Sequence, residues 1–495
     1  MNNSSSNNRI LKGIGSSVVN QVILAVQGIV LVPFFLKAWG VDEYGHWLTL
    51  TAFVSYLTLL DLGGQNYFAN VLAISFAKKD TDEFFHRLSE GVSLFLFLGI
   101  FGFGAWTAII WYGSNWSFPG LERTLLYDEA WILIFMGAFF LLVSNVGGVY
   151  STIYRATGLF ARGAMIGNGM RILSIVISMC LLYFSIEPKN FAAFQFIFGG
   201  LWCSVFLWDS RRKIEGSHKV KINITNAKTG LKHLKSSFYF WILAFSQAIK
   251  QHGTLIILAS FTNPLTVSTF ATHRVLSNFA GYIRVLLQGP VLPELSFLWG
   301  QDRVKELYEF ILISLKWVVV LTGTASILIW FAGSLFYPVW TGNELESHPY
   351  LFFLLLVQGV LVSGSQTASW GLLATNHHRS MAQWSFASSF LTLGLAYYLA
   401  PRYGVTGIVW AGVFSELSIG VLVFPALCGR FFKTSSLPIY RAFINGLLIL
   451  CPFMGLAYLI DGLFSKLSST LILVFLGLIV AFMFKGNPEL KKLKI

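Results

Sequence analysis

Seven charged side chains interrupt stretches of this sequence that are otherwise apolar for about 20 residues, the length that crosses the hydrocarbon core of a bilayer. A charge inside such a stretch costs several kcal/mol unless it faces water or a partner, so each is a candidate for function. Five are basic and two are acidic: Arg171, Lys250, Arg274, Arg284 and Lys316, with Asp61 and Glu416.

The basic excess favours an anionic ligand, because Arg and Lys bind phosphate through charge-assisted hydrogen bonds that a low dielectric strengthens. Lys250 and Arg274 are expected about 20 and about 24 Å from the inner ends of their spans, at one level near mid-membrane. Arg284 lies ten residues after Arg274, about 80° and about 15 Å away on a helix, so both can line one cavity face. We therefore predict Lys250, Arg274, Arg284 and Arg171 as the ligand-binding cations.

Structural roles remain open for each of these cations. Arg284 and Lys316 can extend to the cytoplasmic headgroups. Arg171 can either extend to the headgroups in the same way or bind the ligand. Lys250 and Arg274 can instead form buried ion pairs with one of the two acids, Asp61 and Glu416.

Asp61 and Glu416 are the candidates for ion coupling, because a desolvated carboxyl group can titrate near neutral pH. The alternative is that both are structural counter-ions. No G-x-S-x-G, H-E-x-x-H or Walker-type motif is found, and none of the cysteines has C-x-x-C spacing. We therefore expect no catalytic site, no metal site and no cofactor other than a proton or sodium gradient.

The composition requires a membrane protein. Of the 495 residues, 55% are hydrophobic and only 12% are charged. The net charge of +13 resides mostly in short loops, where membrane orientation explains it better than nucleic acid does. Apolar stretches predict fourteen spans, with twelve as the alternative, near 13–36, 46–66, 91–113, 130–153, 163–185, 190–209, 237–260, 266–290, 308–337, 350–374, 382–400, 404–425, 439–460 and 467–485.

The distribution of basic residues orients these spans. With alternating loops, cytoplasmic segments carry 25 of the 35 Lys and Arg residues and the outer loops only five, which places both termini in the cytoplasm. The linker at 210–236 alone contains eight of them.

The predicted fold is an all-α polytopic membrane protein with about 14 transmembrane helices: two six-helix repeats around a central cavity, and two C-terminal helices. Its parts are an N-terminal half at 1–209, the basic linker at 210–236, a C-terminal half at 237–425, and two further helices with a basic tail at 426–495. Ala156-Thr157 and Ala374-Thr375 recur at the same place in each half, which either reflects duplication or is a coincidence.

Several short motifs resemble, in order and spacing, those of the bacterial polysaccharide (O-antigen) flippases of the multidrug/oligosaccharidyl-lipid/polysaccharide exporter superfamily. They are Gly40–Gly45, Tyr56–Gly63, Arg155–Gly158, Gly289–Glu294, Val339–Gly342 and Tyr403–Gly407. The resemblance implies a flippase that moves an undecaprenyl-pyrophosphate-linked oligosaccharide, such as an O-antigen or other surface-polysaccharide repeat unit, across the bacterial cytoplasmic (inner) membrane by alternating access. The pyrophosphate is then the ligand of the four cations, and other polysaccharide-assembly proteins are possible partners.

Two other functions remain open. A multidrug/cation antiporter of the same superfamily would share the architecture, although amphipathic cations favour acidic cavities. A lipid-linked-sugar polymerase would share the substrate, but it would need a sizeable outer loop with catalytic residues. The longest predicted outer loop, 114–129, is short for that purpose.

Overall fold

The computed structural model describes residues 3–113, 127–213, 220–234, 238–375, 377 and 379–445. Within these ranges the elements are helices and no strand is present. Each of the twelve spans predicted before residue 425 falls in a helical segment, which confirms an all-α polytopic fold. Of the last two predicted spans, 439–460 is described only to residue 445, in a helix that starts at Leu437, and 467–485 lies outside the described residues.

The helices before residue 234 are often interrupted or longer than the predicted spans. In α1, Gly40 takes φ 75° and ψ 177°, a conformation that favours glycine, and it separates two spans. The second span continues beyond its predicted end at 66, because α2 packs against α3 and α5. The elements are α1 (Asn3–Ser55), η1 (Tyr56–Asp61), α2 (Gly64–Ala77), α3 (Thr81–Gly113), α4 (Tyr127–Ala138), η2 (Phe139–Ser144), α5 (Asn145–Ala156), α6 (Phe160–Tyr183), α7 (Pro188–Lys213) and α8 (Ile224–His233).

The helices after residue 238 show the same features. Gly404 has φ 56° and divides α15 into two spans, and α11 continues ten residues beyond its predicted end at 290, to Gly300. The elements are α9 (Phe238–Ala248), η5 (Ile249–Gly253), α10 (Thr254–Phe261), α11 (Pro264–Gly300), α12 (Val304–Trp340), α13 (Pro349–Ala368), α14 (Trp370–Ala374), α15 (Arg379–Ser415), η6 (Glu416–Val421) and α16 (Leu422–Phe431).

Nine helical stretches of the described chain are long and apolar enough to cross a membrane. Two of them, Val19–Asp61 and Arg379–Phe431, contain 43 and 53 residues, which is enough for two crossings each at about 20 residues per crossing. The chain is therefore a multi-pass membrane protein.

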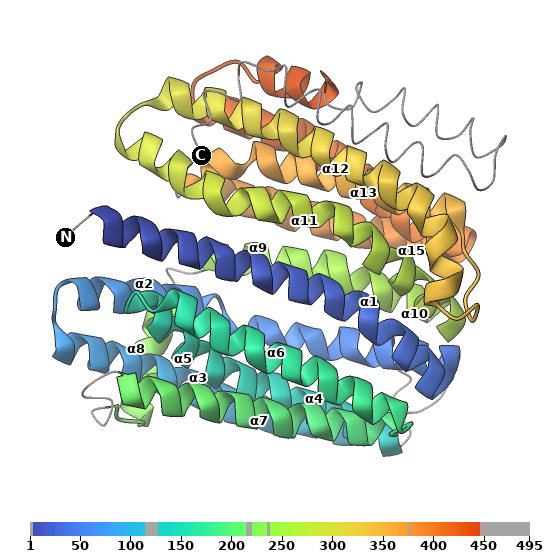
Figure 1. Ribbon diagram of the computed structural model, residues 1–495, viewed down its shortest axis with the longest axis horizontal. Coiled ribbons are helices and arrows are strands. Elements are labelled where there is room, and N and C mark those ends of the chain that lie inside the picture. The colour runs from blue at the N-terminus through green and yellow to red at the C-terminus, as the bar shows by residue number, and fades with distance from the viewer. Residues whose placement is uncertain are drawn as a thin grey trace. The chain divides into compact units, whose positions relative to one another are not determined.

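The chain divides into two compact units. The first contains Met1–Thr272 and Asn376–Ser415, and the second contains His273–Thr375 and the residues from Glu416. In the first unit, α2, α3 and α5 lie side by side (Figure 1) around a core that includes Phe68, Phe95 and Val149. In the second unit, α13 packs against α12, η6 and α16. The predicted sequence halves, their linker and the central cavity stay predictions.

Candidate functional site

Lys250 lies in η5, a π-helical turn inside the seventh predicted span. Such turns are rare and occur frequently at functional sites. The neighbouring His252 ring is 6.2 Å from the ring of Tyr56 in η1. A Cβ atom at Gly253 would lie 2.9 Å from the Tyr56 hydroxyl, so glycine permits this close approach. The first unit therefore places Lys250 on an irregular turn that packs against η1.

Asp61 ends that same η1 segment. Its Oδ1 atom accepts a hydrogen bond of 2.8 Å from the N–H of Gly63, which stabilises the left-handed turn at Leu62 and Gly63. The side chain is partly exposed. In the part of the chain that the structure describes, no cation lies within ion-pair distance of Asp61. The alternative of an ion pair between Asp61 and Lys250 is therefore not seen in this conformation.

Arg171 is the remaining predicted cation of the first unit. It lies on α6, which packs against α1, and its side chain is partly exposed. Among the described residues, no hydrogen bond joins Arg171 to Lys250 or Asp61. The structure therefore places these three residues on different helices of one unit, without direct contact between Arg171 and the other two.

Arg274 and Arg284 lie on α11 in the second unit, and both side chains are partly exposed. His273, next to Arg274, is only 1% exposed. Its ring centroid is 4.2 Å from that of Tyr337 on α12, and its Nε2 atom accepts a hydrogen bond of 3.1 Å from the N–H of His348. His273 therefore fixes this part of α11, while Arg274, one residue on, projects about 100° away around the helix.

Glu416 begins η6, the π-helical turn of the twelfth predicted span, and is 5% exposed. The Ser365 hydroxyl on α13 donates a hydrogen bond to its Oε1 atom. Gly420 lies against the same carboxylate, since a Cβ atom there would overlap Oε1. The buried acid is thus held between a hydroxyl group and a glycine one turn away.

Arg284 is the predicted cation nearest to this acid within the second unit. It is close enough to Glu416 for a favourable electrostatic interaction. Its Nη1 atom donates to Gln288 Oε1 at 3.3 Å, and its Nε atom is buried without a hydrogen-bond partner among the described residues. The structure therefore brings Arg284 and Glu416 close together, and one buried donor of Arg284 has no hydrogen-bond partner among the described residues.

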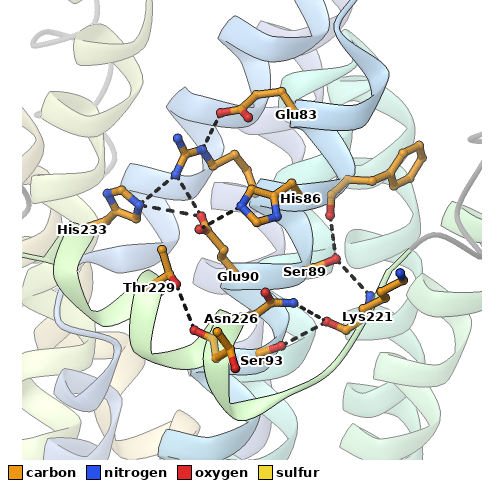
Figure 2. Close-up of polar contacts among 12 residues, drawn as sticks. Glu83, His86, Ser89, Glu90, Ser93, Lys221, Asn226, Thr229 and His233 are labelled. Atoms are coloured by element: carbon orange, nitrogen blue, oxygen red, sulfur yellow. Dashed lines mark hydrogen bonds and ion pairs between the residues drawn. The ribbon is translucent and has the colours of Figure 1, made fainter.

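A second buried acid, Glu90 on α3, was missed in the sequence (Figure 2). It is 0% exposed, and its Oε2 atom accepts a hydrogen bond of 3.0 Å from Arg87 Nη1. The same Nη1 atom lies 2.8 Å from His233 Nε2 on α8; because a guanidinium can only donate, Nε2 accepts. Arg87 Nε also donates to Glu83 Oε1 at 2.7 Å. The predicted span began at residue 91, so Glu90 was counted as part of a loop.

The described part of the basic linker at 220–234 lies beside this network. The N–H of Lys221 donates to Ser89 Oγ at 3.0 Å (Figure 2), and the N–H of Asn223 donates to Ser93 Oγ at 3.2 Å. Asn223 also caps α8, because its Oδ1 atom accepts the N–H of Asn226 at 2.7 Å. The described part of the linker therefore contains a capped helix that is docked on α3.

Comparison with known proteins shows a shared fold without a close relative. No family model and no curated protein matches the sequence. The lipid II flippase MurJ in its inward closed conformation has a TM-score of 0.73 at 15% identity, over 95% of this chain and 98% of MurJ. An outward-facing multidrug resistance MATE family transporter of the MOP superfamily scores 0.57 at 14% identity, over 86% of this chain and 96% of its own. The MATE multidrug transporter DinF-BH scores 0.61 at 13% identity, over 86% and 95%. The chain thus has the all-helical fold of these transporters and flippases.

Proposed function

We propose that this protein is a flippase that carries an undecaprenyl-pyrophosphate-linked oligosaccharide across the bacterial cytoplasmic membrane, with both termini in the cytoplasm. The cargo would be an O-antigen or another surface-polysaccharide repeat unit. The observation that carries the proposal is the excess of basic side chains inside the spans, five against two acids. The fold supports it, since similarity to the lipid II flippase covers more of this chain, and at a higher TM-score, than similarity to the MATE transporters named above.

The four predicted cations suit a diphosphate headgroup. Arg171 and Lys250 lie in the first unit and Arg274 and Arg284 in the second, and all four are partly exposed. Side chains of this kind can bind phosphate oxygens in a wet cavity inside the bilayer, where charge-assisted hydrogen bonds are strong. The polyprenyl chain of the cargo remains in the hydrocarbon of the membrane, so the protein has to enclose only the polar headgroup.

The two acids are the proposed ion-coupling groups. Of the two, Glu416 is the better candidate because of its surroundings. A buried carboxyl group beside a hydroxyl can exchange a proton, or can bind a small cation together with the Ser365 oxygen. Arg284 interacts electrostatically with Glu416. This interaction would link phosphate binding on Arg284 to ion binding on Glu416.

A multidrug/cation antiporter is the second candidate function. The fold of the MATE transporters supports it, and the buried carboxyl of Glu416 is the specific feature that favours it, because a cationic drug needs such a counter-charge. The basic excess argues against this function. A lipid-linked-sugar polymerase is less well supported, since the structures with this fold that we compared are named as flippases and transporters.

Transport by the purified full-length chain in proteoliposomes tests the proposal. One assay follows a fluorescent polyprenyl-diphosphate oligosaccharide between leaflets, and the other follows efflux of a cationic dye. We expect the lipid-linked saccharide to cross and the dye to remain. Dye efflux without saccharide movement would support the antiporter and overturn the flippase. In cells, depletion of the protein should cause the lipid-linked saccharide to accumulate on the inner leaflet.

A further inference from the structure

The outer surface of α8 combines exposed apolar and basic side chains. Ile224 and Leu231 are 55% and 52% exposed, and Lys228 and Lys232 are exposed beside them. At 100° per residue, these four side chains fall within an arc of about 100° on one side of the helix. Apolar and basic side chains that share the exposed side of a helix suit the surface of a membrane, because lysine stems can lie along apolar groups while their charged ends reach the headgroups.

The contacts of α8 with α3 fix the direction in which this face points. Gly230 is buried on the opposite side and Ala227 is buried next to the edge of the exposed arc, and a Cβ atom at Gly230 would lie 3.0 Å from the carbonyl oxygen of Glu90. At the C-terminal end, His233 accepts the hydrogen bond from Arg87 (Figure 2). The helix is therefore held without freedom to turn its exposed apolar residues inward.

The length of α3 places α8 at the level of the lipid headgroups. α3 contains 33 residues, and about 20 of them suffice to cross the hydrocarbon core. Counted from its far end at Gly113, the crossing portion begins close to Leu94. The contacts of α8 lie at this level, because Gly230 faces Glu90 and Leu94, and Asn223 is bonded to Ser93.

The charge of this region is positive. Lys221, Lys228 and Lys232 are all exposed. Two acids of α3 in this region, Glu83 and Glu90, already form ion pairs with Arg87. Each lysine is thus available to a phosphate at the surface of the membrane.

We propose that α8 is an interfacial anchor that binds acidic phospholipids of the inner leaflet. Lys221, Lys228 and Lys232 bind the headgroup phosphates, and Ile224 and Leu231 lie at the boundary with the acyl chains. The inference rests on the cytoplasmic placement of the linker, and it is independent of which cargo the protein carries.

A fluorescent label on α8 tests this proposal in the full-length protein. The label is bimane at Thr225→Cys, an exposed position beside Lys232 on the helix, with Cys180, Cys203, Cys428 and Cys451 replaced by alanine. The protein is reconstituted in vesicles of phosphatidylcholine alone, or of equal parts phosphatidylcholine and phosphatidylglycerol. Lipids with brominated chains report contact of the label with the membrane.

We expect quenching to be strong with phosphatidylglycerol, weak without it, and reduced by salt. Each lysine near an anionic surface contributes about fivefold to binding, so Lys228→Gln with Lys232→Gln should weaken the binding of α8 to phosphatidylglycerol about thirtyfold and reduce quenching. Ile224→Ser with Leu231→Ser should reduce quenching while the salt dependence persists. The matched control is Lys78→Gln with Lys305→Gln, two exposed lysines that lie just after α2 and in the first turn of α12, which should change nothing.

Quenching that is equal in both lipid mixtures would overturn the proposal, and so would an equal effect of the control pair. A label that is shielded from aqueous iodide even in detergent would show that another segment of the chain covers α8, which also overturns it. Because these readouts involve no transport, they stay informative if the cargo assignment fails.

Discussion

Two buried glutamates of this protein have the same side chain and nearly the same burial, but opposite surroundings. Glu90 is 0% exposed and binds Arg87 at 3.0 Å, with His233 close by. Glu416 is 5% exposed; it accepts a hydrogen bond from the neutral Ser365 and lies in the electrostatic field of Arg284. Glu90 lies in a regular helix, whereas Glu416 begins a π-helical turn.

The difference shows that burial alone does not identify a functional acid. A carboxylate that is held by a short ion pair stays charged and contributes to structure, because neutralising it leaves its partner uncompensated. The hydrogen-bond donor to Glu416 is instead the neutral hydroxyl of Ser365, and a hydroxyl group can donate or accept a hydrogen bond. We therefore infer that Glu90 supports docking of the linker helix, and Glu416 remains our proposed group for ion coupling; the following changes test that contrast.

The largest loss of stability is expected from Arg87→Ala. The substitution leaves the buried Glu90 without its main partner, which costs about 3–5 kcal/mol. The measurement is thermal unfolding in detergent, in which size-exclusion chromatography gives the amount of monomer that remains after heating. The midpoint temperature should be much lower than that of the unmodified protein. Replacing both partners, Arg87→Met with Glu90→Leu, should restore most of the midpoint.

Arg303→Ala is the matched control for that experiment. Arg303 also pairs with a glutamate three residues away, Glu306, but both side chains are exposed, and solvent screening leaves such pairs with little effect on stability. An equal loss in the two variants would contradict the structural role of the Glu90 network.

A smaller loss is expected from Gly420→Ala. The new Cβ atom would overlap Glu416 Oε1 and lie 3.0 Å from Ser365 Cβ, so the carboxylate has to move, at a cost of about 1–3 kcal/mol. Transport should lose its dependence on an imposed gradient together with this destabilisation. Gly359→Ala on α13, where nothing lies within 4 Å of the added atom, should change neither property.

Glu416→Gln should alter transport while leaving the fold nearly intact. The amide oxygen can still accept the hydrogen bond from Ser365, so we expect less than about 1 kcal/mol of destabilisation. Because the amide cannot titrate, transport should become insensitive to an imposed proton gradient. Gradient dependence that matches the unmodified protein would assign Glu416 a structural role like that of Glu90.

The smallest effect on stability is expected from Asp61→Asn, which keeps an oxygen that can accept the N–H of Gly63. We expect an unchanged melting midpoint and retained gradient dependence if Glu416 is the coupling acid. A gradient-insensitive Asp61→Asn variant would transfer the coupling role to Asp61.

The fold could be predicted from hydropathy because each crossing needs its own run of apolar residues, and the twelve spans before residue 425 were placed in this way. The continuations of these spans were not predicted: α2 runs to Ala77 and packs against α3 and α5, and a hydropathy window does not detect such packing. Glu90 was missed for a related reason, since a window that seeks apolar residues excludes a charge at its edge.

The candidate site could be predicted only as a set of residues. Lys250 and Glu416 were identified by their charge, but the π-helical turns that hold them depend on local packing and leave no signal in a single sequence. The contact between Ser365 and Glu416 joins positions 51 residues apart, and neither residue indicates the other. The one detectable signal for the linker network was the spacing of Glu83, Arg87 and Glu90 at intervals of three and four, which is typical of helical ion pairs.

Transport of the lipid-linked saccharide by Lys250→Ala and Arg274→Ala, in proteoliposomes and with insertion levels measured in parallel, tests the central claim most directly. A buried charge-assisted phosphate contact contributes on the order of 2 kcal/mol, so each variant should insert normally and lose about thirtyfold in transport, with no rescue by Asp61→Asn or Glu416→Gln. The exposed Lys305→Ala is the control and should transport normally. Recovery of transport when an acid is neutralised together with either cation would contradict the account, because it would show that these cations balance buried acids and do not bind the cargo.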